Sequence, residues 1–598
     1  MSLKMHRLPI KRQITPVSPS KTGVKYRKDC YQARRGILAA KWTKIRSLEL
    51  TMPDVSRSPY LRPGYANYVP LSPISFLQRS ADTFPDKIAV KDGATVLTYR
   101  SLQQRCHALA SALLHQGLQP GQTVAVMMRN THYLLEAHFG VPLAGGVLNA
   151  INTRLDSRAV TYILDHSDAP FMLVDDASLD IACEAAAMAD HPIRIVTANV
   201  TNRPDGSADY EECLSSAPND TRPGLPADEW LPISLSYTSG TTGKPKGVLC
   251  HHRGAYINSL GNVMAARIDD QTNYLWTLPM FHCNGWSHTW GVTAVGGTHI
   301  CLPRIDPARI MELIESERIT HMCAAPVVMK MMLEWAEAHD YRLTSPVRIL
   351  TGGAPPASRT IIEMESIGFD VIQIFGQTET TGPSLIWEKP SNFAALSVLD
   401  RAKLKTRQGH RQVAIEAAIV ANPDTLQELP RDGSSMGELL LRGNTVMMGY
   451  LDDPEETEKA MRGGWFHTGD LAVRHPDGSF EIKDRAKDII ISGGENISCL
   501  EIEEVLQQHQ AVQHVAVVAR PDEKWGEHPC AFIELKSTRS EVTETELVEF
   551  CRRHLASFKV PRSFVFGDLP KTETGKIQKY ILRKELRRTG SQHERETR

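Results

Sequence analysis

The sequence lacks three features that would each assign the chain to a familiar class of protein. No stretch approaches 18 consecutive apolar residues, so nothing supports a membrane-spanning helix. The 11 cysteines are scattered singly without a C-x-x-C pair, which argues against a zinc ribbon or redox motif and favours a reducing compartment. The 68 basic and 69 acidic residues give a net charge of −1, so no basic excess indicates a nucleic-acid partner.

The length of 598 residues exceeds what a single hydrophobic core usually serves, so we expect at least two domains. Helix-like and strand-like stretches alternate over residues 70–484. Residues 101–118, for example, carry apolar side chains at helical spacing, and residues 123–128 then form an apolar strand pattern. This alternation predicts an α/β fold with largely parallel sheets in a large N-terminal domain.

Residues 485–590 have the pattern of a separate, smaller α+β domain, followed by a tail over residues 591–598. Two apolar strand patterns and a helical pattern precede a polar loop and a basic helix. Ser498 and Glu501 match a capping box at the start of a helix. The domain boundary is expected at Lys483 to Asp488.

The N-terminal extension, residues 1–69, is basic. It holds eight lysines and arginines and no acid before Asp29, and residues 31–48 continue this bias with an amphipathic helical pattern. Such a segment is typical of a mitochondrial leader. The alternatives are a disordered basic extension of a cytoplasmic protein, or a wrongly chosen start codon. Each interpretation places the protein inside the cell.

A glycine-rich stretch, YTSGTTGKPKGV (Tyr237 to Val248), follows a predicted strand. Its glycines, hydroxyls and lysines suit a loop around phosphate. A Walker A loop needs a lysine followed by Ser or Thr at the start of a helix, whereas Lys244 precedes Pro245. The sequence therefore excludes a P-loop of that kind, and the remaining alternative is a solvated surface loop.

The glycine-rich stretch resembles the phosphate loop of the adenylate-forming superfamily. Four more stretches match that superfamily in its order, and the resemblance covers about residues 70–588. The stretches are FGQTET (Phe375 to Thr380), WFHTGDLA (Trp465 to Ala472), KDRAKDIIISGGENIS (Lys483 to Ser498) and PKTETGKIQK (Pro570 to Lys579). The chain is most similar to the branch of short- and medium-chain, methylthioalkanoate and benzoate-type CoA ligases.

The resemblance implies a reaction in two halves. A small carboxylic acid attacks the α-phosphorus of ATP, giving an acyl-adenylate and pyrophosphate, and coenzyme A then displaces AMP. ATP, Mg²⁺ and coenzyme A are therefore the implied cofactors and substrates. The alternatives are loading of a carrier protein in trans, a luciferase-like oxygenase on the same fold, and a non-catalytic binding protein.

The resemblance also implies roles for individual residues. Lys576 bridges the carboxylate and the α-phosphate, Glu379 holds Mg²⁺, Thr238 is a catalytic hydroxyl of the glycine loop, and His282 gates the acyl pocket. Asp470 and Arg485 contact the ribose. The implied ATP and AMP contacts are Thr238, Ser239, Gly240, Thr241, Thr242, Gly243, Lys244, Lys246, Gly352, Gly353, Gln377, Thr378, Asp470, Arg485 and Lys576.

Lys487 occupies the implied hinge position, and Gly493 and Gly494 are the implied coenzyme A contacts. Rotation of the small domain at this hinge would exchange Lys576 for the glycine pair between the two half-reactions. Trp286, Gly352 and Phe375 are candidate neighbours of the acyl pocket. A metal site at His282, Cys283 and His288 is disfavoured, because the spacings are irregular.

Overall fold

The computed structural model describes residues 64, 66–218, 224–238, 245–485, 488–492, 495–522, 525–536, 542–571 and 577–586. The chain divides into two units, Met1–Val69 and Pro70–Arg598, and the sheets and helices of the described residues all belong to the second. Residues 1–63 of the basic N-terminal extension, with the leader pattern, lie outside the described residues. Within the described ranges, no helix is both long and apolar enough to cross a membrane.

An eight-stranded sheet carries the glycine-rich stretch. Its parallel centre consists of short apolar strands such as TVAVM, which is buried along its whole length, as expected for a sheet covered on both faces. The antiparallel β8–β9 hairpin and β19 extend one side. In spatial order the strands are β19 (Gly449–Tyr450), β9 (Lys246–His251), β8 (Pro232–Thr238), β4 (Val147–Ala150), β3 (Thr123–Met127), β5 (Phe171–Asp175), β6 (Arg194–Ala198) and β7 (Ala208–Asp209).

A nine-stranded sheet carries the FGQTET stretch at the end of its strand β14. Its centre is parallel, and antiparallel strands close both edges. In spatial order the strands are β16 (His410–Arg411), β15 (Gly382–Ile386), β14 (Phe369–Gln377), β13 (Val347–Thr351), β12 (His321–Cys323), β10 (Asn273–Leu275), β11 (Thr298–Ile300), β1 (Ile88–Asp92) and β2 (Thr95–Thr98).

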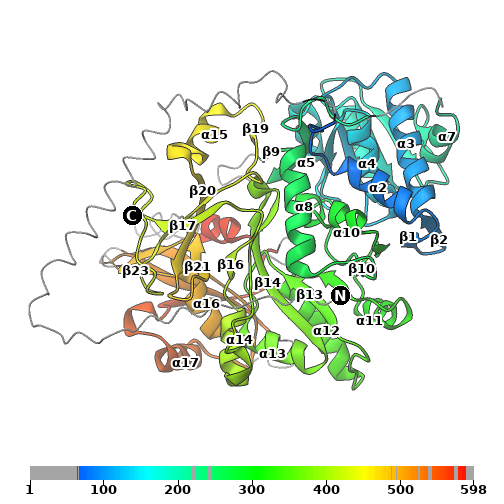
Figure 1. Ribbon diagram of the computed structural model, residues 1–598. Helices are drawn as coiled ribbons and strands as arrows, with labels where there is room; N and C mark the ends of the chain where they lie inside the picture. Colours follow the sequence, from blue (N-terminus) through cyan, green and yellow to red (C-terminus); the bar gives the residue numbers. More distant parts are fainter. Residues whose placement is uncertain are drawn as a thin grey trace, which may run out of the picture. The chain divides into compact units, whose positions relative to one another are not determined.

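Helices connect these strands and supply the apolar side chains that bury them. In Figure 1, α2, α3 and α4 lie together beside the β1–β2 hairpin, and α3 and α4 contact it. The helices are α2 (Ile74–Thr83), α3 (Tyr99–His115), α4 (His132–Leu143), α5 (Ser157–His166), α6 (Leu179–Met188), α7 (Tyr210–Ser215), α8 (His252–Ala266), α9 (Cys283–Trp286), α10 (His288–Val295), α11 (Pro307–Ser316), α12 (Pro326–Ala338), α13 (Ser358–Ser366), α14 (Val398–Lys405) and α15 (Pro454–Ala460).

The predicted helix over residues 101–118 is α3, and its four apolar positions are all buried because they face one stripe of the core. The side chains are those of Leu102, Cys106, Leu109 and Leu113. The helix begins where the Thr98 hydroxyl accepts a hydrogen bond from Ser101 N. The predicted α/β class is confirmed.

A four-stranded antiparallel sheet carries the WFHTGDLA stretch. Its strands, in spatial order, are β17 (Ala417–Ala421), β18 (Gly437–Arg442), β20 (Phe466–Arg474) and β21 (Phe480–Arg485). Asp470 and Arg485 face each other in the β20–β21 register. The expected domain boundary after Asp484 therefore falls at the last residue of a strand, and Arg485 belongs to the β20–β21 hairpin.

The remaining sheet lies in residues 490–566, with its own apolar core against two helices. Its strands are β23 (Glu495–Ile497), β22 (Ile490–Ser492), β25 (Gly526–Leu535), β24 (Val512–Asp522) and β26 (Ser563–Phe566), and its helices are α16 (Cys499–Gln507) and α17 (Glu544–His554). Ser498 caps α16 as expected, by accepting from Glu501 N. The capping box is only half formed, because the Glu501 carboxylate instead pairs with Lys559 at 2.7 Å.

Candidate active site

The two ends of the glycine-rich loop meet at the end of the β8–β9 hairpin. Thr238, the last residue of β8, stands opposite Lys246, the first residue of β9. Ser239, Gly240, Thr241, Thr242, Gly243 and Lys244 lie outside the described residues. The hairpin therefore fixes where the loop starts and ends, as a phosphate-binding loop requires.

Helix α5 holds both ends of this loop, which the sequence did not reveal. The Tyr162 hydroxyl donates to the carbonyl of Pro245 at 3.1 Å. His166 Nδ1 and the Tyr237 hydroxyl share a hydrogen bond of 2.8 Å. Both α5 residues are four apart on one helix face, so a single element positions the entry and the exit of the loop.

Lys246, an expected nucleotide contact, interacts with Glu456 and Tyr450. Its ammonium forms an ion pair with Glu456 of α15. It also lies 4.9 Å from the centre of the Tyr450 ring, within the range of a cation–π contact. Lys246 thus ties β9 to α15, and an anion reaching it would compete with Glu456.

Gln377, Thr378 and Glu379 sit where β14 ends and a single 3-10 turn, Thr378–Thr380, begins. Glu379 Oε1 accepts a hydrogen bond from the Tyr450 hydroxyl at 3.0 Å, and its carbonyl accepts from Met447 N at 2.8 Å. The segment around β19 therefore holds Glu379 at both its side chain and its backbone.

Asp470 is nearly buried, with 3% of its surface exposed, and its carboxylate is bound on both oxygens. Arg485 Nε lies 2.7 Å from Oδ1, and Gln377 Nε2 donates to Oδ2 at 2.5 Å. Gln377 also donates to the carbonyl of Thr468 at 2.9 Å. The predicted ribose residues Asp470 and Arg485 are thus brought together and linked to Gln377 of the FGQTET stretch.

Two buried thiols pack on Thr378. Cys283 Sγ lies 3.1 Å from Thr378 Oγ1 and 3.3 Å from His282 Nδ1, while Cys250 donates weakly to the Thr378 carbonyl at 3.6 Å. Burial raises the pKa of Cys283 to about 12 and that of Cys250 to about 11. Both remain protonated at neutral pH, so neither is suited to be a nucleophile.

The HCNGWS stretch forms a left-handed turn. Five consecutive residues have positive φ: Cys283 (45°), Asn284 (48°), Gly285 (60°), Trp286 (52°) and Ser287 (61°). Such a backbone costs about 1–2 kcal/mol for each residue other than glycine. Side chains of neighbouring elements hold it: the amide of Asn262 donates to the carbonyl of Trp286 at 2.7 Å, and the Ser287 hydroxyl donates to that of Thr381 at 2.9 Å.

This turn presses the Trp286 ring against Gly352. A Cβ at position 352 would lie 3.2 Å from the ring tip of Trp286 and 3.0 Å from the carbonyl oxygen of Ile374, so little room remains for a side chain there. Gly353 is exposed with φ 82°. The structure thus brings Trp286 and Gly352 together, two of the three expected neighbours of the acyl pocket.

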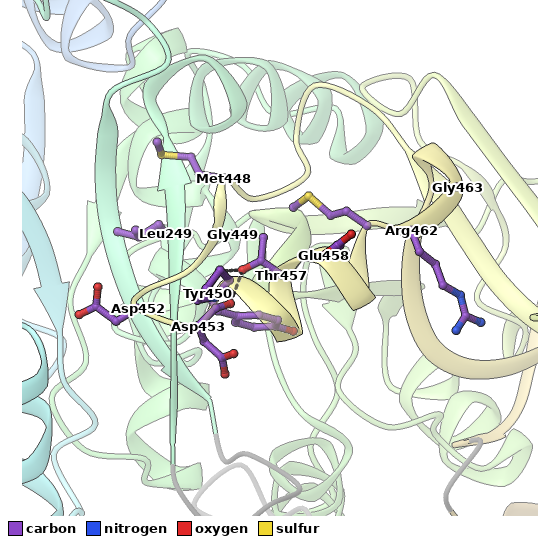
Figure 2. A pocket seen from close by; sticks show the side chains of 12 residues that line it. Leu249, Met448, Gly449, Tyr450, Asp452, Asp453, Thr457, Glu458, Arg462 and Gly463 are labelled. Carbon is purple, nitrogen blue, oxygen red and sulfur yellow. Dashed lines mark hydrogen bonds between the residues drawn. The ribbon is translucent and has the colours of Figure 1, made fainter. Parts of the chain in front are cut away.

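A hollow of about 760 Å³ lies between β19 and helix α15, which follows β19 in the chain (Figure 2). The hollow shares Tyr450 with the site. Its lining includes three acidic residues, Asp452, Asp453 and Glu458, and only one arginine, Arg462. This charge is unfavourable for a triphosphate, so the hollow is a poor candidate for the nucleotide.

Lys487, Gly493, Gly494 and Lys576 lie outside the described residues, so their expected roles stay predictions. The chain on either side of Lys576 is anchored. Lys571 and Ile577 form an antiparallel bridge, and Lys571 pairs with Glu534 at 2.8 Å. Lys579 pairs with the largely buried Glu503 at 2.8 Å.

Sequence reasoning missed Tyr162, His166, Tyr450 and Glu456. Each acts on a residue at least 70 positions away along the chain, so no local spacing indicates its partner. The left-handed turn did leave a local signal, since Asn-Gly inside HCNGWS favours positive φ.

Two protein families match most of this chain. The AMP-binding enzyme family matches residues 77–451, and the AMP-binding enzyme C-terminal domain family matches residues 501–576. A 2-methylpropanoate–CoA ligase, CCL4, from Humulus lupulus is 44% identical over 89% of this chain and 98% of the relative. An acetate/butyrate–CoA ligase, AAE7, from Arabidopsis thaliana, described as peroxisomal, is 42% identical over 88% of this chain and 96% of the relative.

Solved structures share the fold. ATP-bound MatB from Rhodopseudomonas palustris matches with a TM-score of 0.74 and 25% identity, over 86% of this chain and 98% of that one. The anthranilate CoA ligase AuaEII, solved with anthranoyl-AMP, matches with a TM-score of 0.78 and 22% identity, over 88% and 99% of the two chains, which bears on the fold alone. The chain belongs to the AMP-binding enzyme family.

Proposed function

We propose that this acid:CoA ligase forms AMP and acts on a short carboxylic acid, with the active site described above. The observation that carries the proposal is that separate stretches of the chain converge. Gln377, Thr378 and Glu379 adjoin one another, and Gln377 is bonded to the Asp470–Arg485 pair. Tyr450 joins Glu379 to the Lys246 end of the glycine loop.

In the first half-reaction, the acid's carboxylate attacks the α-phosphorus of ATP and pyrophosphate leaves. A carboxylate is a weak nucleophile and ATP is strongly anionic, so the chain's task is alignment and charge neutralisation. Thr238 and the glycine loop would bind the phosphates, and Thr378 and Lys576 would bind the α-phosphate. Asp470 would accept hydrogen bonds from the ribose hydroxyls, sharing its oxygens with Arg485 and Gln377.

The residues present fit a magnesium ion bound together with ATP. Glu379 offers a partly buried carboxylate whose Oε1 is held by Tyr450, while its Oε2 has no hydrogen bond among the residues described. One carboxylate plus substrate phosphates is the usual arrangement for magnesium, which would neutralise phosphate charge there. Glu379 would hold the ion, and the chain would keep the carboxylate oriented.

The Trp286–Gly352 contact supports a short acid as the substrate. The ring of Trp286 covers Gly352, a position expected beside the acyl group, so a long chain would need the ring to move. Relatives that carry the names of acetate, acetate/butyrate and 2-methylpropanoate CoA ligases support a short acid. We therefore propose a substrate of about two to five carbons, with His282 at the pocket entrance.

In the second half-reaction, coenzyme A attacks the activated carbonyl and AMP leaves. We propose that the domain over residues 485–590 turns about Lys487, which moves Lys576 away and brings Gly493 and Gly494 to the pantetheine arm. A glycine pair suits this position because a side chain would obstruct the thiol's path. Loading of a carrier protein is the alternative fate of the same adenylate.

The test is detection of acyl-CoA by mass spectrometry from purified protein with ATP, Mg²⁺ and coenzyme A. Acids from acetate to octanoate, branched acids and benzoate are supplied separately, with Lys576→Ala alongside. A thioester from short acids that is lost in Lys576→Ala is the expected result. Pyrophosphate release without thioester would indicate a carrier-protein acceptor and contradict the ligase assignment.

We propose that residues 1–69 direct the protein to mitochondria. Their basic, acid-poor composition supports a mitochondrial leader, and a reporter protein fused to these residues tests it. Import into mitochondria with cleavage is the expected result, whereas an even cytoplasmic distribution would contradict the leader. The reporter avoids any influence from the rest of the chain.

A further inference from the structure

Tyr450 lies between Glu379, the candidate magnesium ligand, and Lys246, at the end of the glycine loop. Its hydroxyl donates to Glu379 Oε1 at 3.0 Å, and its ring faces the Lys246 ammonium at 4.9 Å. A single aromatic side chain therefore connects the candidate magnesium ligand with the candidate phosphate loop.

The backbone of Tyr450 is itself firmly held. It pairs with Val248 of β9, and its N–H donates to the Thr457 hydroxyl of α15 at 2.9 Å, as Figure 2 shows. The next residue, Leu451, donates to the carbonyl of Gly247 at 2.7 Å. Because β9 and α15 both hold its main chain, Tyr450 is fixed in place and can orient the Glu379 carboxylate.

The hydroxyl is suited to orient Glu379. An ionised carboxylate can only accept hydrogen bonds, and the Tyr450 hydroxyl supplies a donor to Oε1 at 3.0 Å. A donor fixed on Oε1 limits rotation of the carboxylate and leaves Oε2 for a cation. Such outer partners of metal ligands often account for about 10–100-fold in metal affinity.

We propose that Tyr450 is a positioning residue for the adenylation half-reaction, orienting Glu379 toward the metal–nucleotide complex. The Lys246–Glu456 pair supports it by holding a cation against the Tyr450 ring. This inference rests on the proposed role of Glu379 as the magnesium ligand. Tyr450 lies outside the five sequence motifs and would act through Glu379.

The test compares two Tyr→Phe variants in the full-length protein. Tyr450→Phe removes only the hydroxyl and keeps the ring against Lys246. Tyr341→Phe is the matched control, because the Tyr341 hydroxyl also donates to a glutamate, Glu315, at 2.7 Å, on a different part of the fold. The readout is the affinity for Mn²⁺ in the presence of ATP, measured by electron paramagnetic resonance, which needs no turnover.

We expect Tyr450→Phe to weaken Mn²⁺ binding about 10–100-fold, and Tyr341→Phe to leave it unchanged. In a Glu379→Gln background the Tyr450→Phe substitution should have no further effect, because its partner is gone. The Mg²⁺ requirement of pyrophosphate exchange should rise in parallel. Formation of acyl-CoA from supplied acyl-adenylate should stay at the wild-type rate.

Unchanged Mn²⁺ affinity in a folded Tyr450→Phe protein would overturn the inference, as would an equal loss in the Glu379→Gln background. Equal loss of both half-reactions would indicate a merely structural role and would also overturn it. Failure of the proposed function is a separate outcome. In that case wild-type protein would form no acyl-CoA, although its Mn²⁺ and ATP binding could still be measured.

Discussion

At the scale of single residues, Asp470 shows how a carboxylate is oriented for neutral hydroxyl groups. One of its oxygens is bonded to Arg485 and the other to Gln377. Arg485 and Gln377 therefore fix the carboxylate, and ribose hydroxyls would add to these bonds. Such preorganisation lowers the entropy lost on binding.

Asp470→Asn should raise the KM for ATP about 10–100-fold, because it removes a charge-assisted acceptor of the ribose hydroxyls and unpairs Arg485. ATP-dependent pyrophosphate exchange measures this constant. Asp477→Asn is the matched control, since Asp477 also pairs with an arginine, Arg407, at 3.3 Å, outside the site. An unchanged KM in Asp470→Asn would remove this residue from the nucleotide site.

His299 makes a second residue-scale prediction, on the pH dependence of stability. Its Nδ1 accepts from Trp276 Nε1 at 3.1 Å, so the neutral ring carries its proton on Nε2, which lies 2.9 Å from Thr293 Oγ1. Burial lowers the pKa of His299 to about 3, and it lowers those of His138 and His288 to about 4. In the unfolded chain these histidines take up protons near a pH of about 6.5.

Because the folded pKa values are lowered, the stability they contribute is present above about pH 6.5 and is lost as the pH falls toward 4. Each such histidine adds a slope of about 1.4 kcal/mol per pH unit. The free energy of unfolding, measured by denaturant at pH 7, 6 and 5, should fall accordingly. The variant His299→Gln keeps a hydrogen-bond acceptor and a donor. In it, the slope of the unfolding free energy against pH should decrease by about 1.4 kcal/mol per pH unit. An unchanged slope would show that His299 does not contribute to this pH dependence.

At the scale of elements, the hairpin from β14 to β15 depends on Gly376 of the FGQTET stretch. A Cβ at this position would lie 2.1 Å from the carbonyl oxygen of Gly382, on the neighbouring strand. Backbone atoms cannot yield as a flexible side chain can. This close approach explains why a glycine precedes the Gln377–Glu379 segment.

Gly376→Ala should destabilise the protein by about 3 kcal/mol or more, through overpacking at the backbone. Gly93→Ala is the control, because Gly93 has positive φ (59°) but no neighbouring atom within 4 Å of the place that an alanine Cβ would take. The strain of that backbone alone should cost about 1 kcal/mol. Equal unfolding free energies for the two variants would contradict the proposed close approach.

The left-handed turn of residues 283–287 makes the second element-scale prediction. Trp286→Ala should leave the turn in place, since Asn262 bonds the Trp286 carbonyl rather than its ring. Removing the ring opens space beside Gly352, so the preferred acid should lengthen by several carbons. Competition between butyrate and octanoate, scored as the ratio of the two acyl-CoA products, measures the shift. An unchanged ratio would show that Trp286 does not line the acyl pocket.

The sequence predicted elements better than it predicted their contacts. Helix α3, strand β3 and the Ser498 cap follow from local spacing and local hydrogen bonds, and the structure has all three. The ion pair that diverts Glu501 to Lys559 joins residues 58 apart. The hydrogen bonds of α5 to the two ends of the glycine loop also join residues far apart in sequence. No local pattern in one sequence predicts which distant residues will form such contacts.

At the scale of the whole molecule, alternation of helix and strand patterns predicted parallel sheets correctly but could not give their order. The early hairpin β1–β2 joins the sheet that holds β10 to β14, strands that follow it only after β3 to β9 have built another sheet. The candidate site was predicted through its motifs, and five stretches far apart in sequence indicated it. The residues that position those motifs came only from the structure.

The two half-reactions should depend on different residues, and Lys576 should act only in the first. Wild-type protein and Lys576→Ala are compared in ATP–pyrophosphate exchange with a short acid, and in acyl-CoA formation from supplied acyl-adenylate. The substitution should lower exchange at least about 100-fold, by removing charge stabilisation at the α-phosphate, and should leave thioester formation near the wild-type rate. Retained exchange, or equal loss of both steps in folded protein, would contradict this prediction.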